Sequence, residues 1–474
     1  MRKKNSSSSG RRLIGLAALA VPIAAFLVYW LAFHHPKQPN IVLITLESVR
    51  ADHLGCYGYD KPTSPALDAL AKEGVIYENA QAVTSWTLTA HASIFTGLYP
   101  DAHQVTGPFS RLDDKYTTIT EALANAGYYC AGVISGPYLS RAHNVPQGFQ
   151  HYNENPSAES QSLSHSKVTG REMEAGLRHV INVLRDRKKP MFLFAYFWDP
   201  HYDYIPPAPY DHMFVTPDCQ PIDIRKYESS GRIHPGMAPG ELAYVKSQYD
   251  GEIRWTDEHL GRVFDALKAQ HMWDNTAIIV LADHGEEFFE HGEKGHKKNL
   301  YTESVRIPLI IKYPKGVGVG RDARLASQVD IFPTILELAH AQSDQPNQGL
   351  SLLGPVPPSS RTAYMELLTA NFFPKRGGGF EAREVKNWYG ARQGDYQLIV
   401  QAEAERRELY NMRADPGQRT NIFGQEGTPS NMLISLLQEG AEQDLAIAKV
   451  YGISTEAKLD ESALENLRSL GYVQ

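Results

Sequence analysis

Short, continuous apolar runs rich in β-branched and aromatic residues recur along the middle of the chain. Runs of this kind are typical of strands that are buried on both faces of a sheet. They are Asn40–Leu46, Tyr128–Ile134, Met191–Trp198, Thr276–Ala282 and Ile307–Tyr313.

Segments whose apolar residues recur every three or four positions lie between these runs, as expected of amphipathic helices. One of them carries its own start signal, because Thr118 and Glu121 have capping-box spacing ahead of Ala122–Ala126. Strands that alternate with helices predict an α/β fold, with helices covering both faces of a mostly parallel central sheet. The other predicted helices are 66–72, 173–184 and 242–267.

The pattern changes after a segment rich in Pro, Gly and Ser, Ser343–Ser360. Shorter strand signals and one helical stretch then follow, which predicts a smaller C-terminal α+β subdomain over 346–474 beside a main domain over 40–345. The strand signals are Thr362–Leu367, Tyr396–Gln401 and Glu408–Tyr410, and the helical stretch is Met432–Ala448.

The N-terminus differs from the rest of the chain. Residues 13–33 are 21 apolar or uncharged residues in a row, long enough to cross a bilayer as a helix. Basic residues precede this segment, so we expect a single-pass anchor over 13–33, a cytoplasmic tail over 1–12 and a linker over 34–39. The remainder then lies on the extracytoplasmic side, periplasmic or extracellular. A cleaved signal peptide is the alternative, disfavoured by the length of the stretch.

Charge narrows the range of partners. The first twelve residues carry five basic side chains and no acidic one, which leaves 42 basic and 54 acidic residues in the rest of the chain. A domain with this balance is a poor nucleic-acid binder, so any anionic substrate must be held by local charge or by a metal. The only cysteines, Cys56, Cys130 and Cys219, allow at most one disulfide.

Polar residues follow two of the predicted strands. Glu47 comes directly after the first strand, and Asp283 with His284 follows Thr276–Ala282. Thr87 stands just ahead of a helical stretch, where free N–H groups favour an anion or where Thr87 is simply an N-cap. Because ligands in such sheets gather beyond the carboxyl ends of the strands, these four side chains predict a site for one divalent metal ion.

A threonine hydroxyl is a weak nucleophile, which a metal can activate. We therefore expect Thr87 to attack a tetrahedral ester, and His201, after another strand, to protonate the leaving oxygen. His296 and Lys297 are expected to hold the non-bridging oxygens. Arg50 is a weaker candidate for the same role.

Several motifs, in order, resemble the sulfatase family of the alkaline phosphatase superfamily along nearly the whole chain after residue 38. The segment S-W-T-L-T-A-H-A-S-I-F-T-G at 85–97 is similar to the stretch that carries the family's nucleophile. The other matching segments are Pro39–Gly58, Asp283–His296, Tyr301–Ile311, Glu408–Gly417 and Leu467–Tyr472. The resemblance implies an alkaline phosphatase-like fold, ester hydrolysis and a bound calcium ion.

Departures from the family pattern change the expected chemistry. Thr87 stands where the family has the Cys or Ser that becomes formylglycine. His91 stands in the slot of the Arg that braces it, and we expect His91 to bind substrate there. Glu47-Ser48 replaces a pair of aspartates. A set of Glu, Thr, Asp and His resembles instead the zinc or manganese site of phosphoethanolamine- and lipoteichoic-acid-type transferases, in which Thr is the nucleophile.

The sequence therefore predicts a membrane-anchored, metal-dependent hydrolase that acts on a sulfated or phosphorylated glycan or lipid through Thr87. A phosphotransferase that modifies a cell-envelope acceptor is one alternative. A non-enzymatic relative that binds glycans is the other.

Overall fold

The computed structural model describes residues 38–156, 168–356, 360–374, 380–452 and 456–457. The described residues from 39 onward form one compact unit. Among the residues described, no helix combines the length and the apolar character that a membrane span needs. The expected anchor over 13–33 and its basic tail lie outside these residues, so the anchor stays a prediction.

An eight-stranded sheet forms the centre of this unit, in the order β10-β2-β9-β6-β1-β5-β3-β4. Strand β9 runs antiparallel to β2 and β6, and the other neighbours are parallel, which confirms a mostly parallel sheet. The strands are β1 Asn40–Leu46, β2 Val75–Gln81, β3 Tyr129–Ile134, β4 His151–Asn153, β5 Met191–Phe197, β6 Thr276–Ala282, β9 Leu309–Lys312 and β10 Gly320–Ser327.

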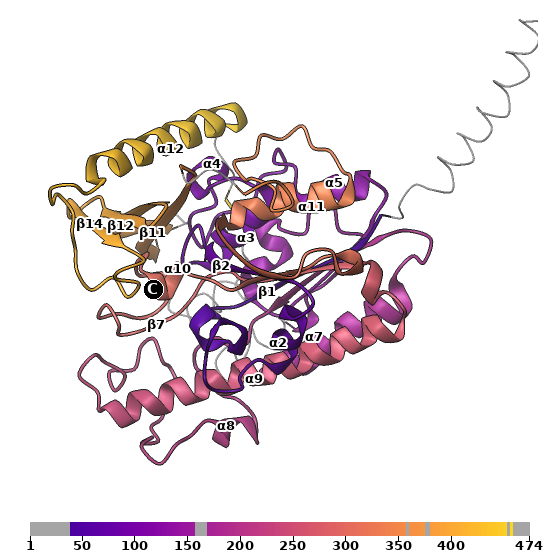
Figure 1. The fold of residues 1–474 in the computed structure, drawn as a ribbon, viewed down its shortest axis with the longest axis horizontal. Helices are drawn as coiled ribbons and strands as arrows, with labels where there is room; N and C mark the ends of the chain where they lie inside the picture. The colour runs from indigo at the N-terminus through magenta and orange to yellow at the C-terminus, as the bar shows by residue number, and fades with distance from the viewer. Residues whose placement is uncertain (1–37, 157–167, 357–359, 375–379, 453–455, 458–474) are drawn as a thin grey trace, which may run out of the picture. The chain divides into compact units, whose positions relative to one another are not determined.

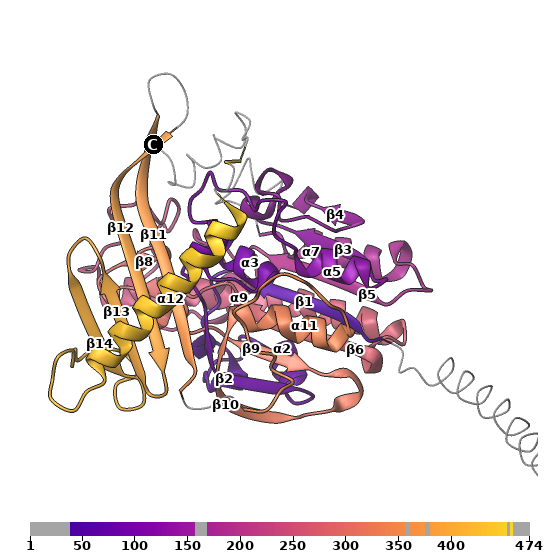
Figure 2. The same cartoon turned by 90° about the horizontal axis from the view of Figure 1, so that it is seen from above.

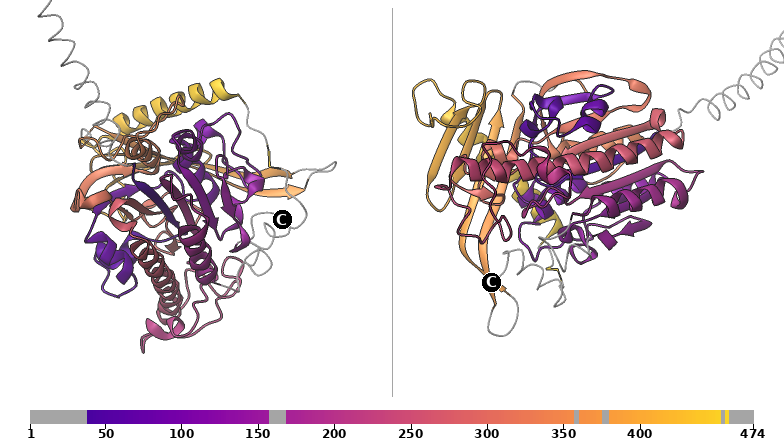
Figure 3. Two further views of the ribbon diagram at one scale, coloured as in Figure 1. Left: turned by 90° about the vertical axis from the view of Figure 1, so that its right-hand side faces the viewer. Right: turned by 90° about the horizontal axis from the view of Figure 1, so that it is seen from below.

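Helices cover both faces of this sheet (Figure 1), as the sequence pattern predicts. Helices α3, α5 and α11 pack together on one face, and α2, α7 and the long α9 pack on the other. Figure 3 (right) shows α9 crossing that second face. The helices are α2 Pro65–Ala71, α3 Thr87–Thr96, α4 Pro100–His103, α5 Ile119–Asn125, α7 Gly170–His179, α8 Tyr210–Met213, α9 Pro239–Ala269, α10 Thr302–Val305 and α11 Ile331–Ala339.

Local signals account for the start of α5 and for the end of α3. The capping box of α5 is confirmed, because the Thr118 hydroxyl accepts from the Glu121 N–H at 3.2 Å and the Glu121 carboxylate accepts from the Thr118 N–H at 2.8 Å. Helix α3 ends where Gly97 takes φ 69°, a left-handed conformation that glycine adopts without steric strain.

A second, four-stranded antiparallel sheet follows the main domain, in the order β11-β12-β13-β14, and α12 packs against it (Figure 2). This confirms a C-terminal subdomain of strands and one helix. Strand β12 was not predicted, because its sequence is largely polar. The elements are β11 Thr362–Pro374, β12 Phe380–Gln393, β13 Tyr396–Gln401, β14 Arg406–Asn411 and α12 Ser430–Tyr451, and β7 Glu287–Phe288 pairs with β8 Lys294–Gly295.

Strand register fixes where the polar residues emerge. Leu46, the last residue of β1, lies opposite Phe197 of β5 on one side and Ala282 of β6 on the other. The residues that follow these three strands therefore leave the sheet side by side at its carboxyl edge. The three cysteines are all free, so the possible disulfide does not form.

Candidate active site and metal centre

Glu47 lies at the centre of the polar group at this edge and is fully buried. Its Oε1 accepts from the Ser48 hydroxyl at 2.7 Å and lies 3.2 Å from His284 Nε2. Its Oε2 accepts from the Thr87 hydroxyl at 3.1 Å and from the Tyr196 hydroxyl. One carboxylate thus joins the end of β1 to β5, to α3 and to the loop after β6.

Thr87 is the first residue of α3 and is 1% exposed. Its Oγ1 lies 3.3 Å from His284 Nε2 in addition to its bond with Glu47. The free N–H groups of a helix start favour negative charge at this point. The hydroxyl is therefore held where it can be ionised and where a substrate anion is favoured.

Asp283 follows β6 and is fully buried. Its Oδ1 accepts from the backbone N–H groups of Ser48 at 3.1 Å and His284 at 2.8 Å. Its Oδ2 has no hydrogen-bond partner and lies 3.6 Å from His284 Nε2. A buried carboxylate oxygen in this state is costly unless a cation is bound to it.

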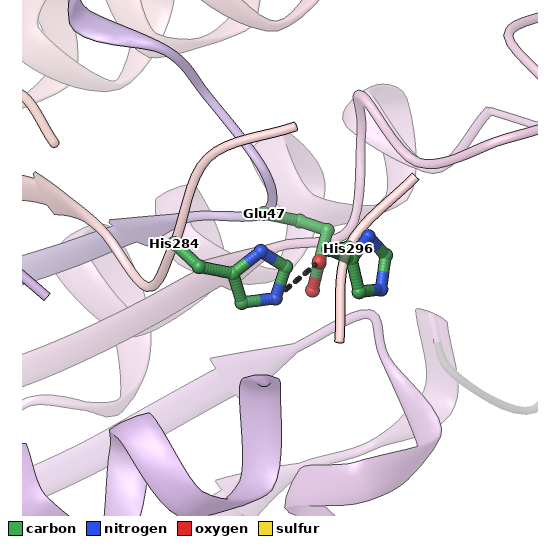
Figure 4. A group of neighbouring side chains, drawn as sticks. All are labelled: Glu47, His284 and His296. Atoms are coloured by element: carbon green, nitrogen blue, oxygen red, sulfur yellow. Dashed lines mark ion pairs between the residues drawn. The ribbon is translucent and has the colours of Figure 1, made fainter. Parts of the chain in front are cut away.

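Glu47, His284 and His296 form a group whose nitrogen and oxygen atoms lie within 4.8 Å of one another, close enough to hold a metal ion (Figure 4). His284 Nδ1 donates to the Gly285 carbonyl at 2.9 Å, which leaves Nε2 as the ligand atom, an arrangement common in metal-binding histidines. Together with the orphaned Oδ2 of Asp283, this donor set fits a divalent ion.

Electrostatics support the same conclusion. Burial raises the pKa of Asp283 well above its usual value, and the charge of Glu47 raises it further. Burial also opposes ionisation of Glu47, yet the neighbouring His284 holds its pKa well below the usual value. Although burial lowers the pKa of His284, Asp283 and Glu47 raise it to about 10. The two acids therefore favour positive charge between them, and a bound metal ion would supply that charge.

The predicted substrate-handling residues His201 and His296 lie beside this centre. The ring of His296 lies 4.4 Å from that of His284 and 5.4 Å from that of His201. His201 stacks on Trp198, with the ring centroids 3.8 Å apart. The structure thus brings both histidines together, and it places His296 within the metal group rather than only beside a substrate.

Lys297, next in sequence to His296, lies beside the start of α3. Its ammonium group lies 4.0 Å from the centroid of the Trp86 ring, and its N–H donates to the Ser85 carbonyl. Burial, with repulsion from Lys298, lowers the pKa of Lys297 to about 7. A lysine that loses its proton near neutral pH suits proton transfer as well as anion binding.

The structure engages His91 inside the protein. The ring is fully buried, its Nε2 lies 2.8 Å from the Thr45 hydroxyl and its Nδ1 lies 2.8 Å from the Thr87 carbonyl. Both ring nitrogens are therefore engaged inside the protein. The expectation that His91 binds substrate does not fit this geometry, which instead suits a residue that fixes the first turn of α3.

Arg50 is likewise engaged. Its guanidinium binds the Asp52 carboxylate at 2.7 Å and 2.9 Å, and it binds Glu290 at 2.9 Å. It also donates to the Glu286 carbonyl at 3.1 Å. With these partners, Arg50 lies in an ion-pair network beside the site rather than in the group around Thr87.

Two contributors to the site were not predicted. Tyr196 donates to Glu47, and Ser48 lies between Glu47 and His296 Nδ1, at 2.7 Å and 3.3 Å. Tyr196 belongs to an apolar strand whose pattern indicates only burial. For Ser48, only its position directly after Glu47 at the end of a strand could have indicated a role in the site.

The family model for sulfatases matches residues 39–341, and the chain belongs to the sulfatase family. A second model, described as the C-terminal part of N-sulphoglucosamine sulphohydrolase, matches residues 290–443. The fold, the family and its named hydrolytic relatives identify the chain as an enzyme of the sulfuric ester hydrolase class.

Curated relatives include an N-acetylglucosamine-6-O-sulfatase of Bacteroides thetaiotaomicron, 25% identical over 86% of this chain and 87% of that protein. The multifunctional alkaline phosphatase superfamily protein PehA of Trinickia caryophylli is 26% identical, covering 67% of this chain and 76% of that protein. A solved phosphonate monoester hydrolase of Agrobacterium radiobacter shares the fold, with a TM-score of 0.67 and 22% identity over 87% of this chain and 96% of that chain.

Proposed function

We propose that this enzyme hydrolyses sulfate or phosphate monoesters of a glycan or lipid, with Thr87 as nucleophile and one divalent ion held by Glu47, Asp283, His284 and His296. The observation that carries the proposal is the contact of the Thr87 hydroxyl with Glu47, inside a buried group in which one oxygen of Asp283 has no hydrogen-bond partner. Localisation on the extracytoplasmic side, through the N-terminal anchor, is part of the same proposal.

The reaction follows from the placement of these side chains. Thr87 Oγ1 gives its proton to the Glu47 carboxylate and attacks the central sulfur or phosphorus, the bond from that atom to the ester oxygen breaks, and the leaving oxygen takes a proton from His201. A bound divalent ion would lower the pKa of the Thr87 hydroxyl and draw negative charge from the ester oxygens. Lys297 holds a non-bridging oxygen, and water then cleaves the ester formed on Thr87. His91 positions the first turn of α3 through the Thr87 carbonyl.

Phosphate esters are a second substrate class that we propose beside sulfate esters. A threonine cannot become formylglycine, and it needs no maturation to act as a nucleophile. The fold neighbours and relatives include a phosphonate monoester hydrolase and a multifunctional superfamily member as well as sulfatases. Transfer of the group from Thr87 to an envelope acceptor is the second candidate, because an ester on Thr87 can react with an alcohol as well as with water.

The test compares wild type, Thr87→Ala and Thr87→Ser on 4-nitrophenyl sulfate, 4-nitrophenyl phosphate, the bis(4-nitrophenyl) diester and a phosphonate monoester, across a panel of divalent ions. We expect Thr87→Ala to lose roughly 10³-fold or more in kcat/KM and Thr87→Ser to keep part of the activity. Thr120→Ala is the matched control, because it removes a buried hydroxyl from α5 without touching the site. Full activity in Thr87→Ala contradicts the assignment of the nucleophile.

Mass spectrometry distinguishes the two candidate functions. A modified Thr87 that decays in water supports hydrolysis. Decay that requires an added alcohol acceptor supports transfer.

A further inference from the structure

The edge of the central sheet opposite the candidate active site is the edge at which β1 begins. Asn40, the first residue of β1, lies opposite Thr276, the first residue of β6, and β5 on the other side begins at Met191 (Figure 2). The loops before these strands therefore share this amino-terminal edge. Because β1 has seven residues, the edge lies roughly 20 Å from Glu47.

The loops at this edge are basic in a chain that is acidic overall. They hold six lysine or arginine residues and three acidic residues, whereas the chain after residue 12 has 42 basic and 54 acidic residues. A surface of this kind attracts anions even though the protein as a whole repels them. The charged residues lie in four segments, which we call the edge loops: 72–74, 185–190, 271–275 and 313–319.

One edge loop concentrates this charge directly ahead of β5. Residues 185–189 read R-D-R-K-K, and Lys188 and Lys189 are exposed. The guanidinium groups of Arg185 and Arg187 donate to backbone carbonyls at 2.8 Å and 3.3 Å. Within the described part of the chain, none of these four side chains forms an ion pair with a carboxylate. Their positive charge is therefore available to an anionic partner.

Apolar side chains are exposed at the same edge. Val183, just before the basic segment, is 65% exposed, and Val317 and Val319, in the turn between β9 and β10, are 69% and 60% exposed. That turn belongs to this edge, because Gly320 of β10 lies opposite Val75, the first residue of β2. Basic side chains with exposed apolar neighbours suit the headgroup region of a membrane, where charge is attracted and apolar groups are partly buried.

We propose that the edge loops dock on a membrane surface with anionic lipid headgroups, and that residues 185–189 make the main electrostatic contact. The course of the chain favours a bilayer over a soluble polyanion, because the predicted span 13–33 and the linker 34–39 come just before β1 in the sequence. Each basic residue at an anionic surface strengthens such binding by about fivefold.

This orientation has a consequence for the substrate. The group around Thr87 lies at the opposite edge of the sheet, so it faces away from the bilayer and receives its substrate from the aqueous side. The inference rests on the proposed anchor, which is part of the proposed function, and it does not depend on the chemistry at Thr87.

Hydrogen exchange on the full chain in lipid nanodiscs tests this contact. One set of discs contains phosphatidylcholine alone, and the other contains equal parts of phosphatidylcholine and phosphatidylglycerol. We expect the amides of 183–189 to exchange about fivefold or more slowly in the anionic discs. Raising the salt concentration from about 0.01 M to about 1 M should remove the difference, because the screening length falls from about 30 Å to about 3 Å. The exposed segment 402–405, after β13, is the internal control and should exchange equally in both.

Charge reversal identifies the residues responsible. Lys188→Glu with Lys189→Glu should abolish the dependence on lipid charge. Arg407→Glu with Arg413→Glu is the matched control, because it makes the same change of net charge at exposed positions on and after β14, and it should keep that dependence. Equal exchange of 183–189 in both discs for wild type overturns the proposal. Protection by a soluble sulfated glycan but not by phosphatidylglycerol means a glycan site and also overturns it.

The same preparation separates the docking surface from the anchor. A chain that stays in solution when detergent is removed contradicts the proposed anchor. Flotation of that chain with vesicles of the two compositions then tests the edge loops alone. Binding to the anionic vesicles only supports the docking surface, and binding to neither overturns it.

Discussion

Asp283 and Glu290 are acids seven positions apart in one loop region, and their surroundings are opposite. Glu290 binds Arg50 at 2.9 Å and Lys246 at 3.1 Å, and although burial opposes its charge, these two cations lower its pKa to about 2. Asp283 is fully buried, leaves one oxygen without a hydrogen bond, and has its pKa raised by burial and by Glu47.

This difference separates a structural acid from one that we propose to be functional. The charge of Glu290 is balanced by side chains of the same chain, so its ion pairs hold the loop and engage Arg50. Among the described residues, Asp283 has no lysine or arginine beside it and leaves one buried oxygen without a hydrogen bond, which supports the proposal that a cation binds there. Buried acids that lack partners are therefore better guides to the site than charged residues that have them.

The largest effect should come from removing the divalent ion that we propose to bind at Asp283. We expect chelation of divalent ions to lower hydrolysis of 4-nitrophenyl esters on the order of 10³-fold, because activation of Thr87 and charge neutralisation are lost together. Readdition of single metals should restore activity and identify the ion. Asp283→Asn should weaken metal binding, measured by titration calorimetry, while Glu290→Gln should bind metal as wild type does. Full activity of the chelated enzyme, verified as metal-free by elemental analysis, contradicts the proposal.

Much of the arrangement behind this expectation was predictable from the sequence. Strands β1 and β6 have the bounds that their apolar runs predict, because a continuous β-branched run leaves little choice of conformation. The polar residues after them had to share one edge of the sheet, so Glu47, Asp283 and His284 could be placed together.

The partners of each side chain were not predictable, because they depend on loops and on contacts distant in sequence. Arg50 and His91 have the right residue types for a substrate anion, yet ion pairs and buried hydrogen bonds engage them elsewhere. The polar β12 gave no clear strand signal.

An intermediate effect is expected from removing the charge of Glu290, which Arg50 and Lys246 balance. Glu290→Gln should lower the free energy of unfolding at pH 7 by roughly 2 kcal/mol, because Arg50 and Lys246 lose their shared partner. The pKa of Glu290 is lower in the folded protein, so its contribution is present above the unfolded value of about 4.3 and fades as pH falls towards about 2. Urea unfolding at pH 7 and at about pH 3.5 measures this. A difference between variant and wild type that is equal at both pH values excludes the ion pair as its cause.

The smallest expected effect distinguishes the two acids best. Replacing Asp283 and replacing Glu290 should change the free energy of unfolding in opposite directions. In the presence of chelator, Asp283→Asn should raise the free energy of unfolding by roughly 0.5–2 kcal/mol, since Asn keeps the acceptor for the Ser48 and His284 N–H groups and removes an unbalanced charge. Saturating metal should reverse the order, because an ion at about 100 times its Kd stabilises wild type by about 2.7 kcal/mol. Thermal and urea unfolding of wild type and of Asp283→Asn, each with and without metal, measure these differences. If Asp283→Asn instead destabilises the metal-free protein as Glu290→Gln does, Asp283 is a structural acid and the contrast between the two sites fails.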